Sequence, residues 1–99
     1  MAKNQAELNK NLTKVLTKIT DETQMCEFLR DLLTEKEMDN LATRLNCAYL
    51  LYSGKTYSAV IEETKLSSTT LSRISRCLRQ GTGYNAVLNI QKEIFKDKL

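Results

Sequence analysis

The sequence predicts an all-α protein with six helices, and three observations lead to that prediction. Its 99 residues contain no proline and only three glycines, so few positions interrupt a helix. Apolar residues recur at intervals of three and four along most of the chain, which places them on one face of a helix. Several of these runs follow a residue able to cap a helix, such as Asp21, Thr34 or Thr56.

Two helices are predicted before residue 34. Residues 4–19 carry an apolar stripe with helical spacing. A second helix is expected from Asp21 to about Leu33, because Asp21 and Gln24 have the spacing of a capping box.

The third predicted helix begins at Thr34 and is the longest. Thr34 and Glu37 form a T-x-x-E capping box, and Gly54 can adopt the left-handed conformation that follows a helix ending near Ser53. Apolar side chains occupy most of its circumference, so most of its surface must be buried. A subunit interface buries such a helix more easily than one small chain does. We therefore expect it at the centre of a homodimer.

A helix-turn-helix is predicted next. A first helix over residues 57–64, capped by Thr56, and a second over about 68–78, capped by Ser67, are joined by a turn at 65–67. The expected apolar skeleton is Val60, Ile61, Thr64, Leu66, Leu71 and Ile74. Two glycines then precede a last helix at about residues 84–96, which we expect to pack on a partner subunit or to close the core.

The polar face of the second helix of this motif combines small hydroxyl residues with arginines. Small hydroxyl side chains let a helix approach base edges, and arginine reaches guanine edges or phosphates. The predicted DNA-binding residues are Lys55, Lys65, Ser67, Ser68, Thr69, Ser72, Arg73, Arg76 and Arg79. The alternative interpretation is a solvated basic helix in an ordinary helical bundle.

Positive charge is concentrated in the same segment. Residues 55–79 hold five basic and two acidic side chains, whereas residues 1–54 hold seven and eight. The net charge of the whole chain is only +3. A local surplus of this kind is the electrostatic footprint of a protein that binds duplex DNA.

Several classes of protein are disfavoured by what the sequence lacks. It has no histidine, no C-x-x-C pair and no phosphate-binding glycine loop, so we predict no metal site, no cofactor and no enzymatic activity. Cys26, Cys47 and Cys77 are interpreted as small buried hydrophobic residues. No apolar run is long enough for a membrane span, and the first residues lack the apolar core of a signal peptide, so we expect a cytoplasmic protein.

The run LLTEKEMDNLATRL, then Gly54, then the helix-turn-helix that ends SRISRCL, resembles the tryptophan repressor superfamily. The sequence is most similar to the branch called YerC/YecD-like Trp-repressor-related proteins, over nearly all of residues 20–95. The matching positions are Leu33, Thr34, Glu37, Leu41, Thr43, Arg44, Ser72, Arg73, Arg76, Cys77, Leu78, Gly81, Gly83 and Tyr84. The resemblance implies a Trp-repressor-like intertwined homodimer. It would form from a single domain of residues 1–99, with dimerisation helices at about 4–53, a helix-turn-helix at about 56–79 and a C-terminal helix at about 84–96.

The resemblance also implies a pocket for a small effector. In the tryptophan repressor a threonine, two arginines and a serine hold the amino acid, and the matching residues here are Thr34, Arg44, Arg73 and Cys77. Ile74 replaces the glycine that makes room for the indole ring. The arginines still suit a carboxylate, although a salt bridge is the alternative role of the first. We expect tryptophan not to bind, and whether any other effector binds is left open.

Lys65 is a second departure from the family, because relatives often carry glycine at this position of the turn. If the backbone there is left-handed, lysine costs about 1 kcal/mol relative to glycine. The same lysine would lie close to DNA phosphates.

Together these features predict a sequence-specific DNA-binding regulator of transcription. We expect it to be a repressor and to act as a homodimer on double-stranded DNA. Two heads in a two-fold dimer predict a palindromic operator with half-sites about 34 Å apart. The alternative is a dimeric protein-interaction module whose helix-turn-helix no longer binds DNA.

Overall fold

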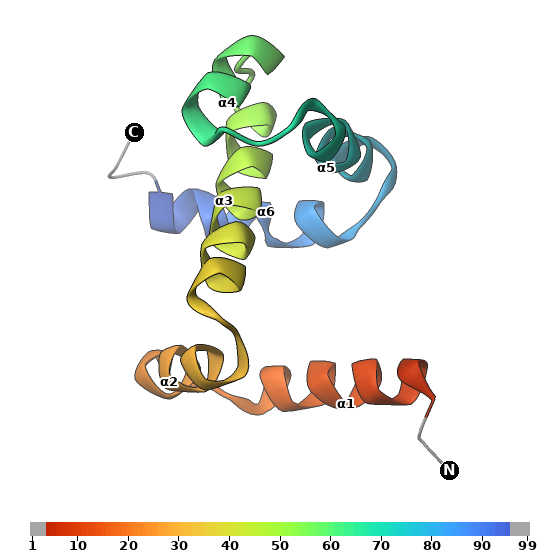
Figure 1. Cartoon of the computed structure of the whole chain (residues 1–99), viewed down its shortest axis with the longest axis vertical. Coiled ribbons are helices and arrows are strands. Elements are labelled where there is room, and N and C mark those ends of the chain that lie inside the picture. Colours follow the sequence, from red (N-terminus) through yellow and green to blue (C-terminus); the bar gives the residue numbers. More distant parts are fainter. Residues whose placement is uncertain (1–3, 96–99) are drawn as a thin grey trace. The chain divides into compact units, whose positions relative to one another are not determined.

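The computed structural model describes residues 4–95, and within them all regular secondary structure is α-helix (Figure 1). The helices are α1 (Gln5–Lys18), α2 (Glu22–Leu32), α3 (Glu35–Tyr52), α4 (Tyr57–Thr64), α5 (Ser68–Gln80) and α6 (Gly83–Phe95). The all-α, six-helix prediction is therefore confirmed. α5 continues to Gln80, past the expected end near Leu78, and the predicted end of the last helix at Lys96 lies outside the described residues. None of the described helices combines the length and apolarity that a membrane crossing requires.

Contacts along the chain group it into two compact units, with the boundary between Met38 and Asp39. The first unit holds α1, α2 and the first turn of α3, and the second holds the remainder of α3 with α4, α5 and α6. The single domain expected from the sequence stays a prediction.

In the first unit, local side-chain caps set where the helices begin. Asn4 accepts a hydrogen bond from the Glu7 backbone N–H at 2.9 Å, and Asp21 accepts one from the Gln24 N–H at 2.8 Å. Neither α1 nor α2 buries a residue in the single chain. Their apolar stripes are therefore available to a partner. The expected burial of Cys26 in α2 is wrong for the single chain. Its side chain is exposed, because nothing in this chain covers the helix face that carries it.

The reciprocal capping box at the start of α3 is confirmed. The Glu37 N–H donates to Thr34 Oγ1 at 3.1 Å, and the Thr34 N–H donates to Glu37 Oε1 at 2.8 Å. The hydrogen bond from the Thr34 backbone lowers the pKa of Glu37 below its ordinary value of 4.5, because it favours the charged carboxylate. After α3, Gly54 has a φ of +95°, in the left-handed region that the sequence reserves for glycine.

The core of the second unit lies where the end of α3 meets the helix-turn-helix. Its buried members are Cys47, Ala48, Leu50, Val60, Leu71 and Ile74, with Ile61 and Leu66 of the predicted skeleton packed partly buried against them. Only the second half of α3 is buried in this way, since Leu41 remains 51% exposed. The extensive burial expected for this helix is thus not met within one chain.

Polar and aromatic contacts hold α6 against α3, among them the Lys92 ammonium over the Tyr52 ring, 5.9 Å from its centroid. Gln91 Nε2 donates to the Leu45 carbonyl oxygen at 2.7 Å, and the rings of Tyr49 and Phe95 meet edge to face with centroids 5.1 Å apart. α6 in turn contacts α5, so these interactions also support the second helix of the helix-turn-helix.

Candidate nucleic-acid interface

A turn at residues 65–67 joins α4 to α5 (Figure 1), and a side-chain cap begins each of the two helices. Thr56 accepts the Ala59 N–H at 3.2 Å to begin α4, and Ser67 accepts the Thr70 N–H at 3.1 Å to begin α5. Between them Lys65 ends α4 with φ 61° and ψ 16°, so the expected left-handed residue is present. Its N–H donates to the Ile61 carbonyl at 2.8 Å, which satisfies one of the last carbonyls of α4.

α5 separates an apolar face from a polar one. Leu71, Ile74 and Ser75 are buried against the rest of the second unit. All nine residues predicted to bind DNA are exposed. The positions of the buried residues, three and four apart, force the residues between them outward.

A shallow groove of about 550 Å³ runs along this outward face and is lined by Thr69, Thr70, Ser72, Arg73, Arg76 and Arg79. The structure therefore brings five of the predicted DNA-binding residues together on one surface, and no acidic side chain lines it. The hydroxyl of Ser67 is engaged with Thr70, through the cap and through a hydrogen bond to Thr70 Oγ1 at 3.0 Å. Lys55, Lys65 and Ser68 lie outside this groove.

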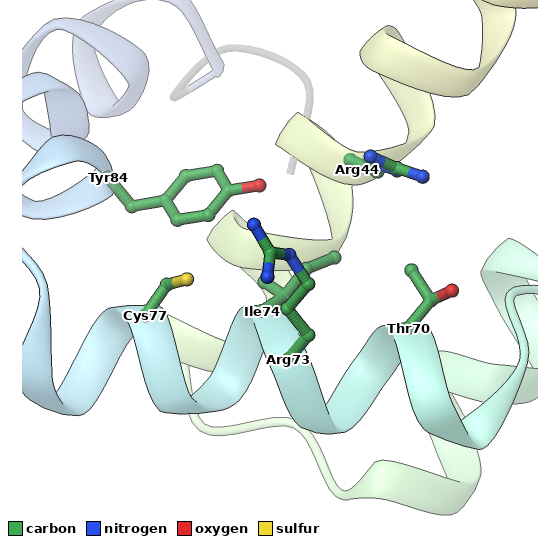
Figure 2. A pocket seen from close by; sticks show the side chains of 6 residues that line it. All are labelled: Arg44, Thr70, Arg73, Ile74, Cys77 and Tyr84. Atoms are coloured by element: carbon green, nitrogen blue, oxygen red, sulfur yellow. The ribbon is translucent and has the colours of Figure 1, made fainter.

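A smaller pocket, of about 210 Å³, shares Thr70 and Arg73 with the lining of the groove (Figure 2). Its lining residues are Arg44, Thr70, Arg73, Ile74, Cys77 and Tyr84, which come from α3, α5 and α6. Three of the four residues predicted for an effector pocket, Arg44, Arg73 and Cys77, thus meet. Thr34 belongs to the first unit, where its hydroxyl caps α3.

The electrostatics of this pocket are positive. Among the described residues neither Arg44 nor Arg73 forms an ion pair with a carboxylate, so the salt bridge considered for Arg44 is not present there. Tyr84 extends from α6 toward the Arg73 guanidinium (Figure 2). Burial raises the pKa of Tyr84, and the two arginines partly oppose that rise. Tyr84 therefore stays a neutral phenol at physiological pH.

Sequence reasoning assigned no site role to Thr70 or Tyr84. A signal existed for each. Thr70 stands four residues before Ile74, hence one turn away on the same helix face, and Tyr84 closes the G-x-G-x-Y stretch that follows α5.

The family description "Trp repressor protein" matches residues 7–92 of this chain, which include both the groove and the pocket. The chain belongs to the Trp repressor family. That family is one of DNA-binding regulators. The "Uncharacterized protein YerC" of Bacillus subtilis (strain 168) is 36% identical over 88 residues, covering 88% of this chain and 84% of its own length.

Superposition on a solved structure supports the same family. It is described as that of "a putative Trp repressor from Staphylococcus aureus", superimposes with a TM-score of 0.73 at 29% identity, and covers 89% of this chain and 88% of its own. The Trp-repressor-like fold and the resemblance to the YerC branch are thus both confirmed. Ile74, the residue expected to fill the room of an indole ring, is only 2% exposed and lines the small pocket.

Proposed function

We propose that this protein is a sequence-specific DNA-binding regulator of transcription, a repressor, that acts in the cytoplasm as a homodimer on a palindromic operator. The observation that carries the proposal is the groove on α5, where hydroxyl and guanidinium groups share one exposed surface without an acidic neighbour. Thr69, Ser72 and Arg73, with Ser68 beside them, are the base-reading groups. Lys55, Lys65, Arg76 and Arg79 are the phosphate-binding groups.

The homodimer is supported by apolar surface that one chain leaves open. Large apolar side chains that are more than a third exposed include Leu8, Leu12 and Val15 of α1, Leu41 and Leu45 of α3, and Val87, Ile90 and Ile94 of α6. Each helix therefore presents an apolar face to solvent, and association of two copies removes such faces from water. Two copies also provide two α5 helices, as a palindromic operator requires.

A binding selection from a random duplex pool tests the proposal. The wild-type protein should enrich an inverted repeat, and Thr69→Ala should enrich a repeat altered at one symmetric pair of positions. Arg76→Ala should enrich the wild-type repeat but bind every duplex more weakly. With four phosphate-binding cations per subunit, the logarithm of affinity should fall with the logarithm of salt at a slope of about −7. Recovery of no motif would contradict the proposal.

The second candidate function, a dimeric protein-interaction module, predicts a different result. Light scattering would still show such a dimer, but the dimer would bind no duplex even at low salt. The positive groove favours the DNA-binding proposal, because a docking surface for another protein has no need to exclude acidic side chains along a whole helix face.

The small pocket is proposed to exclude tryptophan. Its two guanidinium groups suit a carboxylate, but Ile74 occupies the position that is glycine where an indole ring is accommodated. Titration calorimetry with tryptophan should give no binding heat, and a saturable signal would contradict this interpretation. A thermal-shift screen of amino acids against the full chain addresses other effectors.

A further inference from the structure

A third depression, of about 270 Å³, lies where the start of α4 meets the last turn of α5. It is lined by two leucines, Leu51 and Leu78, and by side chains that carry polar groups: Tyr52, Lys55, Tyr57, Ser75, Arg79 and Asn85. Two of these side chains are cations and none is acidic. Asn85 already donates to the Leu78 and Gly81 carbonyl oxygens at 2.8 and 3.1 Å, so its amide N–H groups serve to cap α5.

Arg79 and Tyr57 are held in this depression by Ser75. The Arg79 guanidinium donates from Nη1 to Ser75 Oγ at 2.7 Å, and Ser75 is only 8% exposed. Since a guanidinium has no acceptor, the serine oxygen must accept. This bond uses one of the five arginine N–H groups, and Arg79 also interacts with Tyr57.

Tyr57 lies with Ser75 in the lining of this depression. Hydrogen bonding to Ser75 lowers the pKa of Tyr57, and the Arg79 guanidinium contributes to the same effect. That direction fits a serine hydroxyl that donates to the phenol oxygen, because such a bond stabilises the phenolate. The tyrosine O–H then remains available as a donor, and Tyr57 is 45% exposed.

The chemistry of the depression suits one phosphate group. A phosphate offers several acceptor oxygens, and Lys55, Arg79 and the Tyr57 hydroxyl supply two charges and donors on three sides. Arg79 also lines the groove along α5, so a group bound here would adjoin a duplex read by that helix. This continuity favours a phosphate of the DNA backbone over a free anion.

We infer that this depression binds one backbone phosphate in each half-site, contacted by Tyr57, Lys55 and Arg79, with Ser75 as the positioning residue for Tyr57 and Arg79. The inference rests on the proposed function and adds to it a built phosphate site with a tyrosine that the sequence did not single out. The site fixes the register of α5 in the groove of the duplex, because phosphate contacts determine how a reading helix is placed.

The test uses the selected operator and a set of matched variants. Tyr57→Phe keeps the ring and removes the donor, so it should weaken binding about tenfold on all sequences. Arg79→Gln should also reduce the steepness of the salt dependence by about 2 for the dimer. Tyr49→Phe removes a hydroxyl from the packed interface with Phe95 and should bind as the wild type does. Ser75→Ala should show both a smaller loss of affinity than Tyr57→Phe and a smaller change of salt dependence than Arg79→Gln. A loss of packing alone would not change the salt dependence.

Duplexes with a single uncharged methylphosphonate locate the site. One position per half-site should weaken the wild-type protein about tenfold and should have a smaller effect on Arg79→Gln, in which only Lys55 and Tyr57 still contact that phosphate. Wild-type-like binding by both variants, with no coupled position, would overturn the phosphate site while leaving the DNA-binding function intact. No duplex binding by the wild-type protein would overturn both. A thermal shift with inorganic phosphate that depends on Tyr57, without any coupled DNA position, would assign the depression to a free anion and overturn the backbone assignment.

Discussion

Replacement of Lys65 by glycine should raise the stability of the protein and weaken its binding to DNA. Lys65 has φ 61°, where a side chain with a Cβ is strained by about 1–2 kcal/mol relative to glycine. Glycine loses part of this advantage, about 0.4–1 kcal/mol, because it makes the unfolded chain more flexible. Lys65→Gly should therefore raise the free energy of unfolding by about 1 kcal/mol over Lys65→Ala.

The matched alanine variant separates strain from charge. Both variants remove the lysine ammonium, but only glycine removes the strain. Thermal unfolding of a chain of this length should show Lys65→Gly melting about 4–8 °C above Lys65→Ala. In DNA binding the two should agree with each other, each weaker than the wild type and each with a salt dependence shallower by about 2 for the dimer.

Two results would refute this reasoning. Equal melting temperatures for the two variants would mean that the left-handed turn costs nothing. Unchanged affinity and salt dependence in both variants would mean that Lys65 lies away from the phosphates. Such a result would leave the backbone strain at this position unaffected.

Three further outcomes follow from the caps and the core. Ser67→Ala should lower the free energy of unfolding by about 1 kcal/mol in urea titrations, and Ser68→Ala, one position later, should change it far less. The pKa of Glu37 is lowered, so its bond to Thr34 stabilises α3 above about pH 4.5 and is lost as pH falls through the folded-state pKa. Acid titration followed by circular dichroism should show this loss in the wild type and not in Glu37→Gln, and identical profiles would contradict it. Burial raises the pKa of the Cys47 thiol, so a thiol reagent should modify Cys47 only as fast as the protein unfolds, and rapid modification of the native chain would refute its burial.

The features predicted well from the sequence are those set by residues three or four apart. Thr34, Thr56 and Ser67 each cap the helix that follows, as their spacing predicted, because a cap needs only a side chain and the N–H groups of the next turn. The buried face of α5 follows from the same short-range periodicity, and so does the exposure of its polar residues.

The features that were missed depend on residues brought together by tertiary contacts. α5 continues to Gln80, and at its end Asn85 of α6 donates to the Leu78 and Gly81 carbonyl oxygens. This contact between α6 and the end of α5 cannot be obtained from spacing along one helix.

The candidate site likewise has one part that the sequence predicted and one part that it did not. The α5 groove was predicted because its residues share one helix face. The link from Tyr57 through Ser75 to Arg79 was not, because it joins the first residue of α4 to the last turn of α5. Cys26 failed for a further reason, since an apolar helix face indicates burial without indicating whether the same chain supplies the cover.

The central claim is that α5 distinguishes one DNA sequence from another, and a specificity ratio tests it most directly. Dissociation constants should be measured at one physiological salt concentration for the selected inverted repeat and for a shuffled duplex of the same composition. We predict a ratio of at least about 10³, with two chains bound per repeat. A ratio near one would contradict the claim, because phosphate contacts alone bind both duplexes equally.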